Sequence, residues 1–295
     1  MAAGQGGLGG LARRVGAAGT SIPNLAWVGL FFVAPAAVML VYSFAHQDSL
    51  TAKISYDWTS ENYRRIDDAI VVRALLRSLW ISGVSTLACL VLGYPLAYFL
   101  AFRAGHFKYY LLAGVIVPFL TSFVVRTYAW IEILGPKGVV NDVLMTLRIV
   151  DHPLPLLYNR TGIVIGIVYN YLPLMVLSLY VVLDRIDVRV VESARDLGAS
   201  ALTTFTRVIF PQALPGMIAG IIAVGAPAAG EYVIPSILGG GKTLMFGNII
   251  AAQFGSTFAW PYGAALALLL AGLLLVLIAI CLRLVGPHRM RQVQL

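Results

Sequence analysis

The chain has 295 residues, of which 59% are hydrophobic and only 12% are charged, whereas a soluble domain carries roughly 25% charged residues. This composition excludes an ordinary soluble protein and predicts an integral membrane protein. The basic residues behind the net charge of +8 are scattered, so a positively charged cytoplasmic face explains them and nucleic acid is not an expected partner. Cys89 and Cys281 lie in apolar segments and are expected to be buried packing residues.

Six segments are long and apolar enough to cross a bilayer. A Gly- and Ala-rich segment at 1–24 precedes them and is predicted to be a flexible cytoplasmic tail. The first apolar run, 25–44, follows two arginines but is too long for the core of an export signal. The predicted spans cover residues 25–44, 78–102, 109–134, 161–183, 212–234 and 259–284. The connections contain a short amphipathic helix after Ser60, a short helix near 140–148 and a glycine-rich outer loop after the fifth span. Residues 286–295 form a second cytoplasmic tail.

The polar stretch between the fourth and fifth spans carries the clearest motif. Residues 192–216 read ESARDLGASALTTFTRVIFPQALPG, which predicts two short helices joined at Gly198, a residue free to adopt a sharp turn. Ser200 is a candidate cap for the second helix, and Pro211 marks where the next span begins. Apolar residues recur at helical spacing. Such a helix-turn-helix is suited to lie in a groove on another protein.

This stretch resembles the EAA loop of the permease subunits of ABC importers. The family pattern is kept at Glu192, Ala194, Gly198 and Pro211. Mild replacements stand at Ser193, Val208 and Phe210. The resemblance implies an all-α membrane protein with six transmembrane helices, the type I permease fold and both termini in the cytoplasm. It also implies that 25–285 is the permease domain and that the loop at 187–215 couples it to an ATP-hydrolysing subunit. Because Lys and Arg are only slightly more numerous on the side of the termini, this coupling role decides the orientation.

The chain itself shows no catalytic or nucleotide motif. Gly241-Lys242-Thr243 looks like the end of a phosphate-binding loop, but Ser236 stands where that pattern needs Gly, and the preceding element is an apolar helix. The histidines are spread over separate loops without ligand spacing. We therefore expect a transporter subunit rather than an enzyme, with no metal or cofactor in this chain. ATP and Mg²⁺ are expected on the partner ATPase.

Three charged residues fall within predicted spans, namely Arg126, Glu132 and Glu231. A charge in the bilayer is costly, so such residues face a cavity or a partner. Two interpretations remain open. In the first, Arg126 forms an ion pair with a glutamate. In the second, these residues line a substrate path in the outer half of the membrane. The fifth span is also thin, and its small residues either leave room for a pathway beside Pro227 or serve close helix packing.

Aromatic residues lie at a similar depth, and they are Tyr128, Trp130, Tyr169, Tyr171 and Tyr232. Aromatic rings together with carboxylates suit a cationic amine, since each cation–π contact contributes roughly 0.5 to 2 kcal/mol. The alternative is the aromatic belt that membrane proteins place at the bilayer interface. On the first interpretation, Glu231 faces the pathway and holds the amine.

The segments TSFVVRTYAWIEI (121–133) and GEYVIPSILGGGKTLMFGN (230–248) resemble the spermidine/putrescine permeases, and the likeness covers about residues 25–285. It implies a multi-pass inner (plasma) membrane subunit that moves polyamines inward by alternating access. The implied partners are a second homologous permease, two ATP-binding subunits, an extracytoplasmic solute-binding protein and membrane lipid. Related permeases carry opines, aminophosphonates or ferric iron, so the substrate stays open. A secondary transporter driven by an ion gradient is the rival class.

Overall fold

The structure is a computed structural model that describes residues 23, 26–48, 51 and 53–285. Nearly all of the predicted tail 1–24 and the whole predicted tail 286–295 lie outside the described residues. The chain divides into two compact units. The first unit comprises Met1–Ile66 and Gln253–Leu269, and the second unit comprises Asp67–Ala252 and Leu270–Leu295.

Within the described part of the chain, five helices are long and apolar enough to cross a membrane. They are Ala26–Ser43, Ala69–Phe102, Arg160–Leu183, Ala201–Ala229 and Trp260–Arg283. A sixth candidate is a pair of helices, Gly105–Phe119 and Phe123–Thr146, bent by 91° at a short break. The six predicted spans are therefore all present when this pair counts as one.

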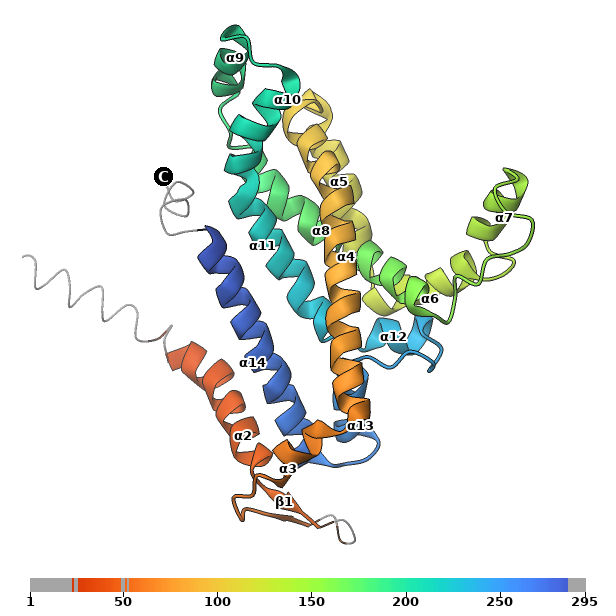
Figure 1. The fold of residues 1–295 in the computed structure, drawn as a ribbon, viewed down its shortest axis with the longest axis vertical. Helices are drawn as coiled ribbons and strands as arrows, with labels where there is room; N and C mark the ends of the chain where they lie inside the picture. Colours follow the sequence, from red (N-terminus) through yellow and green to blue (C-terminus); the bar gives the residue numbers. More distant parts are fainter. Residues whose placement is uncertain (1–22, 24–25, 49–50, 52, 286–295) are drawn as a thin grey trace, which may run out of the picture. The chain divides into compact units, whose positions relative to one another are not determined.

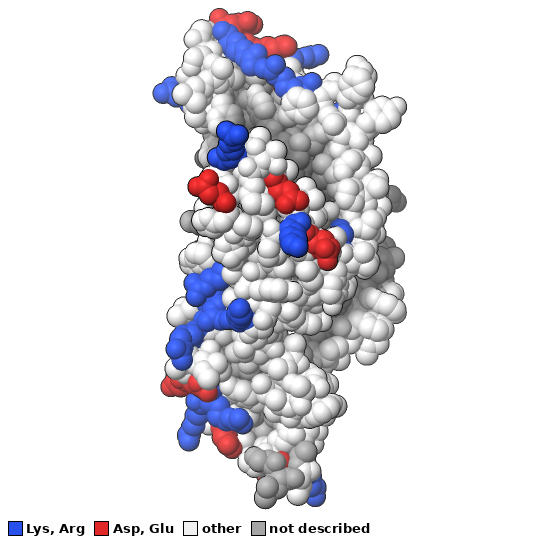
Figure 2. Space-filling model, turned by 90° about the vertical axis from the view of Figure 1, so that its right-hand side faces the viewer, with Lys and Arg blue, Asp and Glu red and all other residues white. Residues whose placement is uncertain are grey.

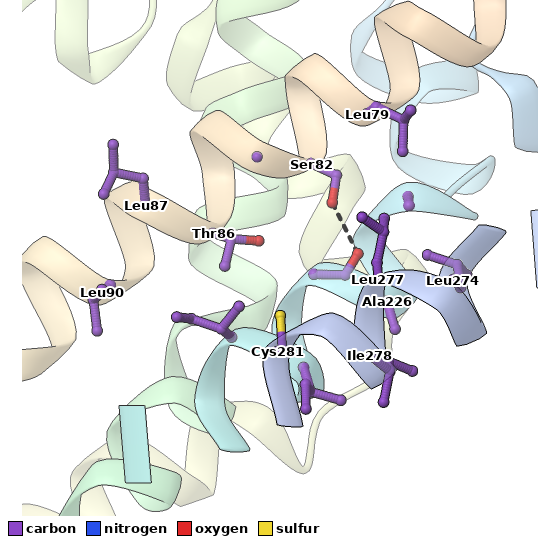
Figure 3. A pocket seen from close by; sticks show the side chains of 15 residues that line it. Leu79, Ser82, Thr86, Leu87, Leu90, Ala226, Leu274, Leu277, Ile278 and Cys281 are labelled. Carbon is purple, nitrogen blue, oxygen red and sulfur yellow. Dashed lines mark hydrogen bonds between the residues drawn. The ribbon is translucent and has the colours of Figure 1, made fainter. Parts of the chain in front are cut away.

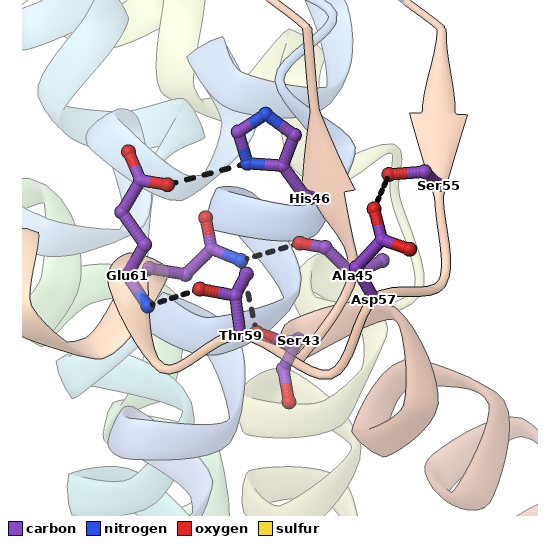
Figure 4. A network of polar contacts seen from close by, with 8 residues as sticks. Ser43, Ala45, His46, Ser55, Asp57, Thr59 and Glu61 are labelled. Carbon is purple, nitrogen blue, oxygen red and sulfur yellow. Dashed lines mark hydrogen bonds and ion pairs between the residues drawn. The ribbon is translucent and has the colours of Figure 1, made fainter.

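In the first unit, a polar network ties the loop after the first span to the end of that span (Figure 4). The span comprises η1 (Gly29–Val33) and α2 (Ala34–Ser43). It is followed by a two-stranded hairpin of β1 (His46–Gln47) and β2 (Ile54–Ser55). Two short helices, α3 (Glu61–Arg64) and η2 (Arg65–Asp67), come next. Asn62 Nδ2 donates to the carbonyls of Ser43 and Ala45, at 3.0 and 2.9 Å. The short helix predicted after Ser60 is present, whereas the hairpin departs from the all-α prediction.

The core of the second unit is formed by α4 (Ala69–Phe102), α8 (Arg160–Leu183) and α11 (Phe210–Ala229), which run side by side (Figure 1). Their facing residues, among them Leu100 and Leu179, are fully buried. Close approach depends on glycine, because a Cβ on Gly216 would lie 2.9 Å from the Ser178 carbonyl oxygen, and one on Gly220 2.5 Å from a sulfur of α8. These small residues of the fifth span therefore serve helix packing, which was one of the two open interpretations.

The prediction of one continuous helix over 109–134 is wrong. Helix α5 (Lys108–Phe119) follows η3 (Gly105–Phe107) and ends at Phe119. After a short break, α6 (Phe123–Leu134) continues at a sharp angle to α5. Pro118 lies in the last turn of α5, where it lacks an N–H and its ring crowds the preceding turn. Ser122 then adopts a non-helical conformation (φ −55°, ψ 125°). The predicted short helix near 140–148 is present as α7 (Val139–Thr146).

Two further boundaries also differ from the predictions. Helix α4 begins at Ala69 rather than at residue 78, and the fifth span ends at Ala229 rather than at residue 234. After a break at 230–232, the chain forms α12 (Val233–Leu238) and then a glycine-rich loop. Helix α13 (Phe246–Gly255), which was not predicted from the sequence, follows this loop and precedes α14 (Trp260–Val285). The N-terminus of α13 is fixed by a distant residue, since Ser78 Oγ accepts the Phe246 N–H at 2.7 Å.

Candidate coupling surface and substrate pathway

The predicted sharp turn is present at Gly198, between α9 (Val188–Asp196) and α10 (Ala201–Thr204). Gly198 has φ +83°, its N–H donates to the Arg195 carbonyl at 2.8 Å, and the Ala199 N–H donates to the Ala194 carbonyl at 3.1 Å. These two bonds form a Schellman motif, which ends a helix with a left-handed residue. Ser200 Oγ accepts the Thr203 N–H at 3.2 Å, so Ser200 caps α10 as expected.

The apolar residues of this loop divide into an anchored set and an exposed set. Val191 is buried against the core of the second unit, together with Ile209. In contrast, the side chains of Leu197 and Leu202, on either side of Gly198, are 89% and 72% exposed. Glu192 is also exposed, and Figure 2 shows acidic and basic side chains gathered at the end that carries α9, at the top of the view. Exposed leucines bordered by charges of both signs suit contact with another protein.

Helix α11 (Phe210–Ala229) begins next to Pro211, as predicted, but α10 continues into it without a break in the helix. The joint is a π-helical turn, η4 (Phe205–Ile209), in which the Phe210 N–H donates to the Phe205 carbonyl. A π-turn widens the helix where Pro211 would otherwise crowd the preceding turn. The half-buried Val208 and Pro211 lie in this joint. The result is one continuous helix over Ala201–Ala229.

An aromatic cluster fixes this joint to α4. The ring of Phe205 lies 5.7 Å from that of Tyr94 and 6.2 Å from that of Tyr98, both in edge-on geometry, and 6.2 Å from that of Phe210. Edge-on aromatic pairs stabilise such contacts beyond the effect of burial alone. The sequence analysis did not identify this cluster, because its members come from two helices more than 100 residues apart.

Glu231 lies at the break between α11 and α12, and its side chain is buried. Its Oε1 accepts the backbone N–H groups of Tyr232 (3.0 Å), Val233 (2.9 Å) and Ile234 (3.4 Å). Its Oε2 accepts the hydroxyl of Tyr171, on α8, at 2.7 Å. Hydrogen bonds of this kind to a carboxylate are about twice as strong as neutral ones. The carboxylate therefore holds the first turn of α12 and ties it to α8.

Arg126 does not pair with a glutamate in the part of the chain that the structure describes. The ion pairs Lys108–Asp184 and His46–Glu61, each at 3.2 Å, do not involve Arg126. The guanidinium of Arg126 instead lies over the ring of Phe119, 5.3 Å from its centroid. The ion-pair interpretation of Arg126 is therefore wrong in this structure, and its place along a substrate path stays a prediction.

The structure brings together half of the residues predicted to line the pathway. Besides the Tyr171–Glu231 contact, the rings of Trp130 and Tyr169 lie 5.1 Å apart at 68°. Trp130 and Tyr171 also pack against one buried cluster, which is formed by residues of α4, α8, α11 and α12 and includes Ile234. The other four predicted residues have no described side-chain contact with these, and they are Arg126, Tyr128, Glu132 and Tyr232.

A separate apolar groove lies between α4, α11 and α14 (Figure 3). It encloses about 360 Å³ and is lined in part by Gly225, Ala226 and Ala229, three further small residues of the fifth span. The described residues that line it include neither a carboxylate nor an aromatic ring. The groove therefore lacks groups that would recognise a cation. Cys281 lies in it and is only half-buried, contrary to expectation, whereas Cys89 is fully buried as predicted.

Asn248 is a positioning residue that the sequence analysis missed. Its Nδ2 donates to the Tyr232 carbonyl (2.9 Å) and to Ser236 Oγ (2.8 Å), and its Oδ1 accepts the Met245 N–H (3.0 Å). Asn248 thus holds α12 and the N-terminus of α13 together beside Glu231. Most of its partners are 12 to 16 residues away along the chain, so local sequence carries no signal for this role.

The arrangement of the spans is that of an ABC importer permease. The chain superposes on a bacterial ABC transporter involved in the import of the acidic polysaccharide alginate, with a TM-score of 0.72, covering 94% of this chain and 97% of that one. Sequence identity is 15%, so this likeness concerns the fold. A second structure, in which the alginate transporter is bound to a periplasmic protein carrying an alginate pentasaccharide, gives a TM-score of 0.73 at 16% identity. The predicted type I permease fold is confirmed.

Residues 6–292 match the family described as "Binding-protein-dependent transport system inner membrane component", and the chain belongs to this family. It is therefore a multi-pass inner-membrane transport subunit and not an enzyme, as predicted. The spermidine/putrescine transport system permease protein PotB of Escherichia coli (strain K12) is 40% identical over 239 residues, covering 81% of this chain and 86% of that protein. PotB of Haemophilus influenzae is 35% identical over 257 residues, covering 87% and 90%.

Proposed function

We propose that this chain is the permease subunit of an ATP-driven importer of polyamines. The observation that carries the substrate class is the 40% identity, over most of both chains, to a permease named for spermidine and putrescine. The proposed complex contains a second homologous permease, two ATP-binding subunits and an extracytoplasmic solute-binding protein. ATP and Mg²⁺ belong to the ATP-binding subunits in this proposal.

The proposed mechanism is alternating access driven through the α9–α10 loop. Closure of the ATP-binding subunits moves this loop, and the continuous helix Ala201–Ala229 transmits the movement over about 43 Å at 1.5 Å per residue. Its far end is the break that carries Glu231. Shifting the inward–outward equilibrium from 1:99 to 99:1 requires about 5.5 kcal/mol of differential binding, which must pass through the exposed residues around Glu192 and Gly198.

In the proposed site, Glu231 attracts the protonated amine. Its Oε1 is occupied by three backbone N–H groups, whereas its Oε2 accepts only the Tyr171 hydroxyl among the described residues. In this proposal, the ammonium group binds to this second oxygen, either beside Tyr171 or in its place. Trp130, which packs against the same buried cluster as Tyr171 and pairs with Tyr169, would offer cation–π contacts of roughly 0.5 to 2 kcal/mol each. A neutral solute would gain neither interaction.

Replacement of Glu231 by Gln tests this role. The amide oxygen can still accept the three backbone N–H groups, and the amide NH₂ can donate to the Tyr171 oxygen, so shape is kept while charge is lost. We expect spermidine uptake by the reconstituted transporter to fall at least tenfold, equivalent to about 1.4 kcal/mol, with unchanged assembly. The companion variant Tyr171→Phe removes the other partner of Oε2 but keeps the charge and the aromatic ring, so uptake should fall less than in Glu231→Gln. Normal uptake by Glu231→Gln would refute the role of Glu231.

The energy source and the substrate class have separate tests. Uptake should stop when ATP is depleted while the proton gradient stays intact, whereas an ion-gradient transporter would continue. A second substrate class is supported by a putative 2-aminoethylphosphonate transport system permease protein, PhnU of Salmonella typhimurium, which is 34% identical over 164 residues, or 54% of this chain. A binding screen on the matching solute-binding protein distinguishes the two classes, because only the aminophosphonate carries an anionic group.

A further inference from the structure

A basic pocket lies at the end of the second unit that is opposite to α9. The aromatic contacts of Tyr94 and Tyr98 with Phe205 place the C-terminal part of α4 near α10, so the N-terminal turns of α4 lie at the far end (Figure 1). There, a cavity of about 230 Å³ is lined by Arg73 and Arg77 of α4 and by Lys242 of the glycine-rich loop. This pocket is distinct from the polyamine pathway proposed above and does not rest on it.

Two of the three cations are held by backbone carbonyls, and no acidic side chain lines the described pocket. Arg73 Nε donates to the Ala69 carbonyl at 2.9 Å, and Arg77 Nη1 donates to the Leu244 carbonyl at 3.0 Å. Each guanidinium has five N–H donors, so both keep donors for a ligand. No acidic residue is among the described residues that line the pocket. The nearby carboxylate of Asp68 accepts the Ile70 N–H and caps α4. Three positive charges that line one pocket repel one another, and an anion bound in the pocket would relieve that repulsion.

The depth of the pocket relates it to the membrane surface. Helix α4 has 34 residues, or about 51 Å at 1.5 Å per residue, whereas the hydrocarbon core is about 30 Å thick. The ends of α4 therefore extend into the headgroup regions. Leu76 and Trp80 on the same helix are 60% and 55% exposed and lie one turn apart, and exposed tryptophan is typical of the bilayer interface. The cations thus lie beside a lipid-facing surface.

The pocket also has an apolar part. Ile70 of α4 and Leu244 and Ile249 on the other side line it together with the cations. A free inorganic anion would gain nothing from these three side chains. A phospholipid presents a phosphate next to glycerol and acyl carbons, and this combination matches the lining.

We propose that this pocket binds the headgroup of an anionic phospholipid such as phosphatidylglycerol. The phosphate contacts Arg73, Arg77 and Lys242, and the glycerol ester region contacts the apolar side chains. With the topology proposed above, the lipid belongs to the outer leaflet. Because Lys242 comes from the loop between α12 and α13, the bound lipid joins this loop to α4. The Gly-Lys-Thr run thereby gains a role in phosphate binding without being part of a nucleotide site.

The test measures lipid binding to the purified full-length chain by native mass spectrometry during titration with phosphatidylglycerol or phosphatidylcholine. The variant Arg73→Gln/Lys242→Gln leaves Arg77 and its bond to the Leu244 carbonyl intact. Near a membrane surface each basic residue contributes about fivefold to the binding of anionic lipid, so we expect about 30-fold weaker binding of phosphatidylglycerol. The matched control, Lys137→Gln/Arg148→Gln, removes the same charge from loops outside the pocket and should bind as the unaltered chain does.

Four results would overturn the proposal. The first is unchanged phosphatidylglycerol binding in the double variant and in a triple variant that adds Arg77→Gln. The second is equal binding of phosphatidylcholine, which would mean that the site does not select an anion. The third is displacement of the lipid by millimolar inorganic phosphate, which would assign the pocket to a free anion. The fourth is unchanged lipid binding with weaker binding of the solute-binding protein, which would make the pocket a protein contact.

Discussion

Gly198 offers a precise test of the coupling loop, because its substitution has a single physical cost. Its φ of +83° lies in the left-handed region, which costs a residue with a Cβ roughly 1 to 2 kcal/mol. Nothing lies within 4 Å of a Cβ built at this position, so steric contact within the chain adds nothing. Asparagine tolerates the left-handed region better than alanine does, whereas β-branched valine tolerates it worse.

The expected order of loss therefore follows backbone strain. A cost of 1 to 2 kcal/mol corresponds to a factor of about 5 to 30 in an equilibrium constant. We expect Gly198→Ala to weaken binding of the ATP-binding subunit by up to this factor, Gly198→Asn by less and Gly198→Val by more. ATP-driven uptake should fall in the same order. Thermal unfolding should change little, because the turn lies outside the core formed by α4, α8 and α11.

The assay is a binding titration of the ATP-binding subunit onto the reconstituted permease, with uptake measured in the same vesicles. Asparagine is larger than alanine but is less strained, so the two variants separate strain from contact. Stronger binding by Gly198→Ala than by Gly198→Asn would show that a partner surface packs on this residue. Binding and uptake by Gly198→Val at the level of the unaltered protein would refute the coupling role altogether.

Four further variants have expected outcomes. Glu192→Ala should leave the melting temperature unchanged but lower ATP-driven uptake, and unchanged uptake would remove Glu192 from the coupling surface. Gly216→Ala should destabilise the chain by roughly 1 to 3 kcal/mol, because its Cβ would lie 2.9 Å from the Ser178 carbonyl oxygen. Gly83→Ala has open space at its Cβ and should raise the free energy of unfolding by up to about 1 kcal/mol. Equal melting temperatures for Gly216→Ala and Gly83→Ala would contradict the close packing of α8 on α11. Asn248→Ala removes three hydrogen bonds and should cost roughly 1 to 3 kcal/mol, visible as faster hydrogen exchange in α12 and α13.

The coupling loop shows how far local sequence reaches. The turn at Gly198 and the cap at Ser200 were both predictable, because each depends on residues within a few positions. The division of the apolar residues into a buried Val191 and an exposed Leu197 was not predictable from their spacing. Helical periodicity places residues on a common face, but the neighbouring helix decides how much of that face it covers.

The composition and apolar run lengths determined a six-span membrane protein, and the motif around Glu192 determined its class, since both signals are contained in contiguous residues. The tertiary structure decided where the spans break. Pro118 was visible in the sequence, but a proline does not always end a helix. The chain breaks soon after Pro118, whereas the π-turn before Pro211 lets the helix continue. The tertiary structure also decided the partners of Glu231, which are the Tyr171 hydroxyl and the first turn of α12 rather than Arg126. A buried carboxylate accepts hydrogen bonds from whichever donors the packed helices bring close to it. Tyr171 is 60 residues away from Glu231 along the chain, so local sequence does not reveal this contact.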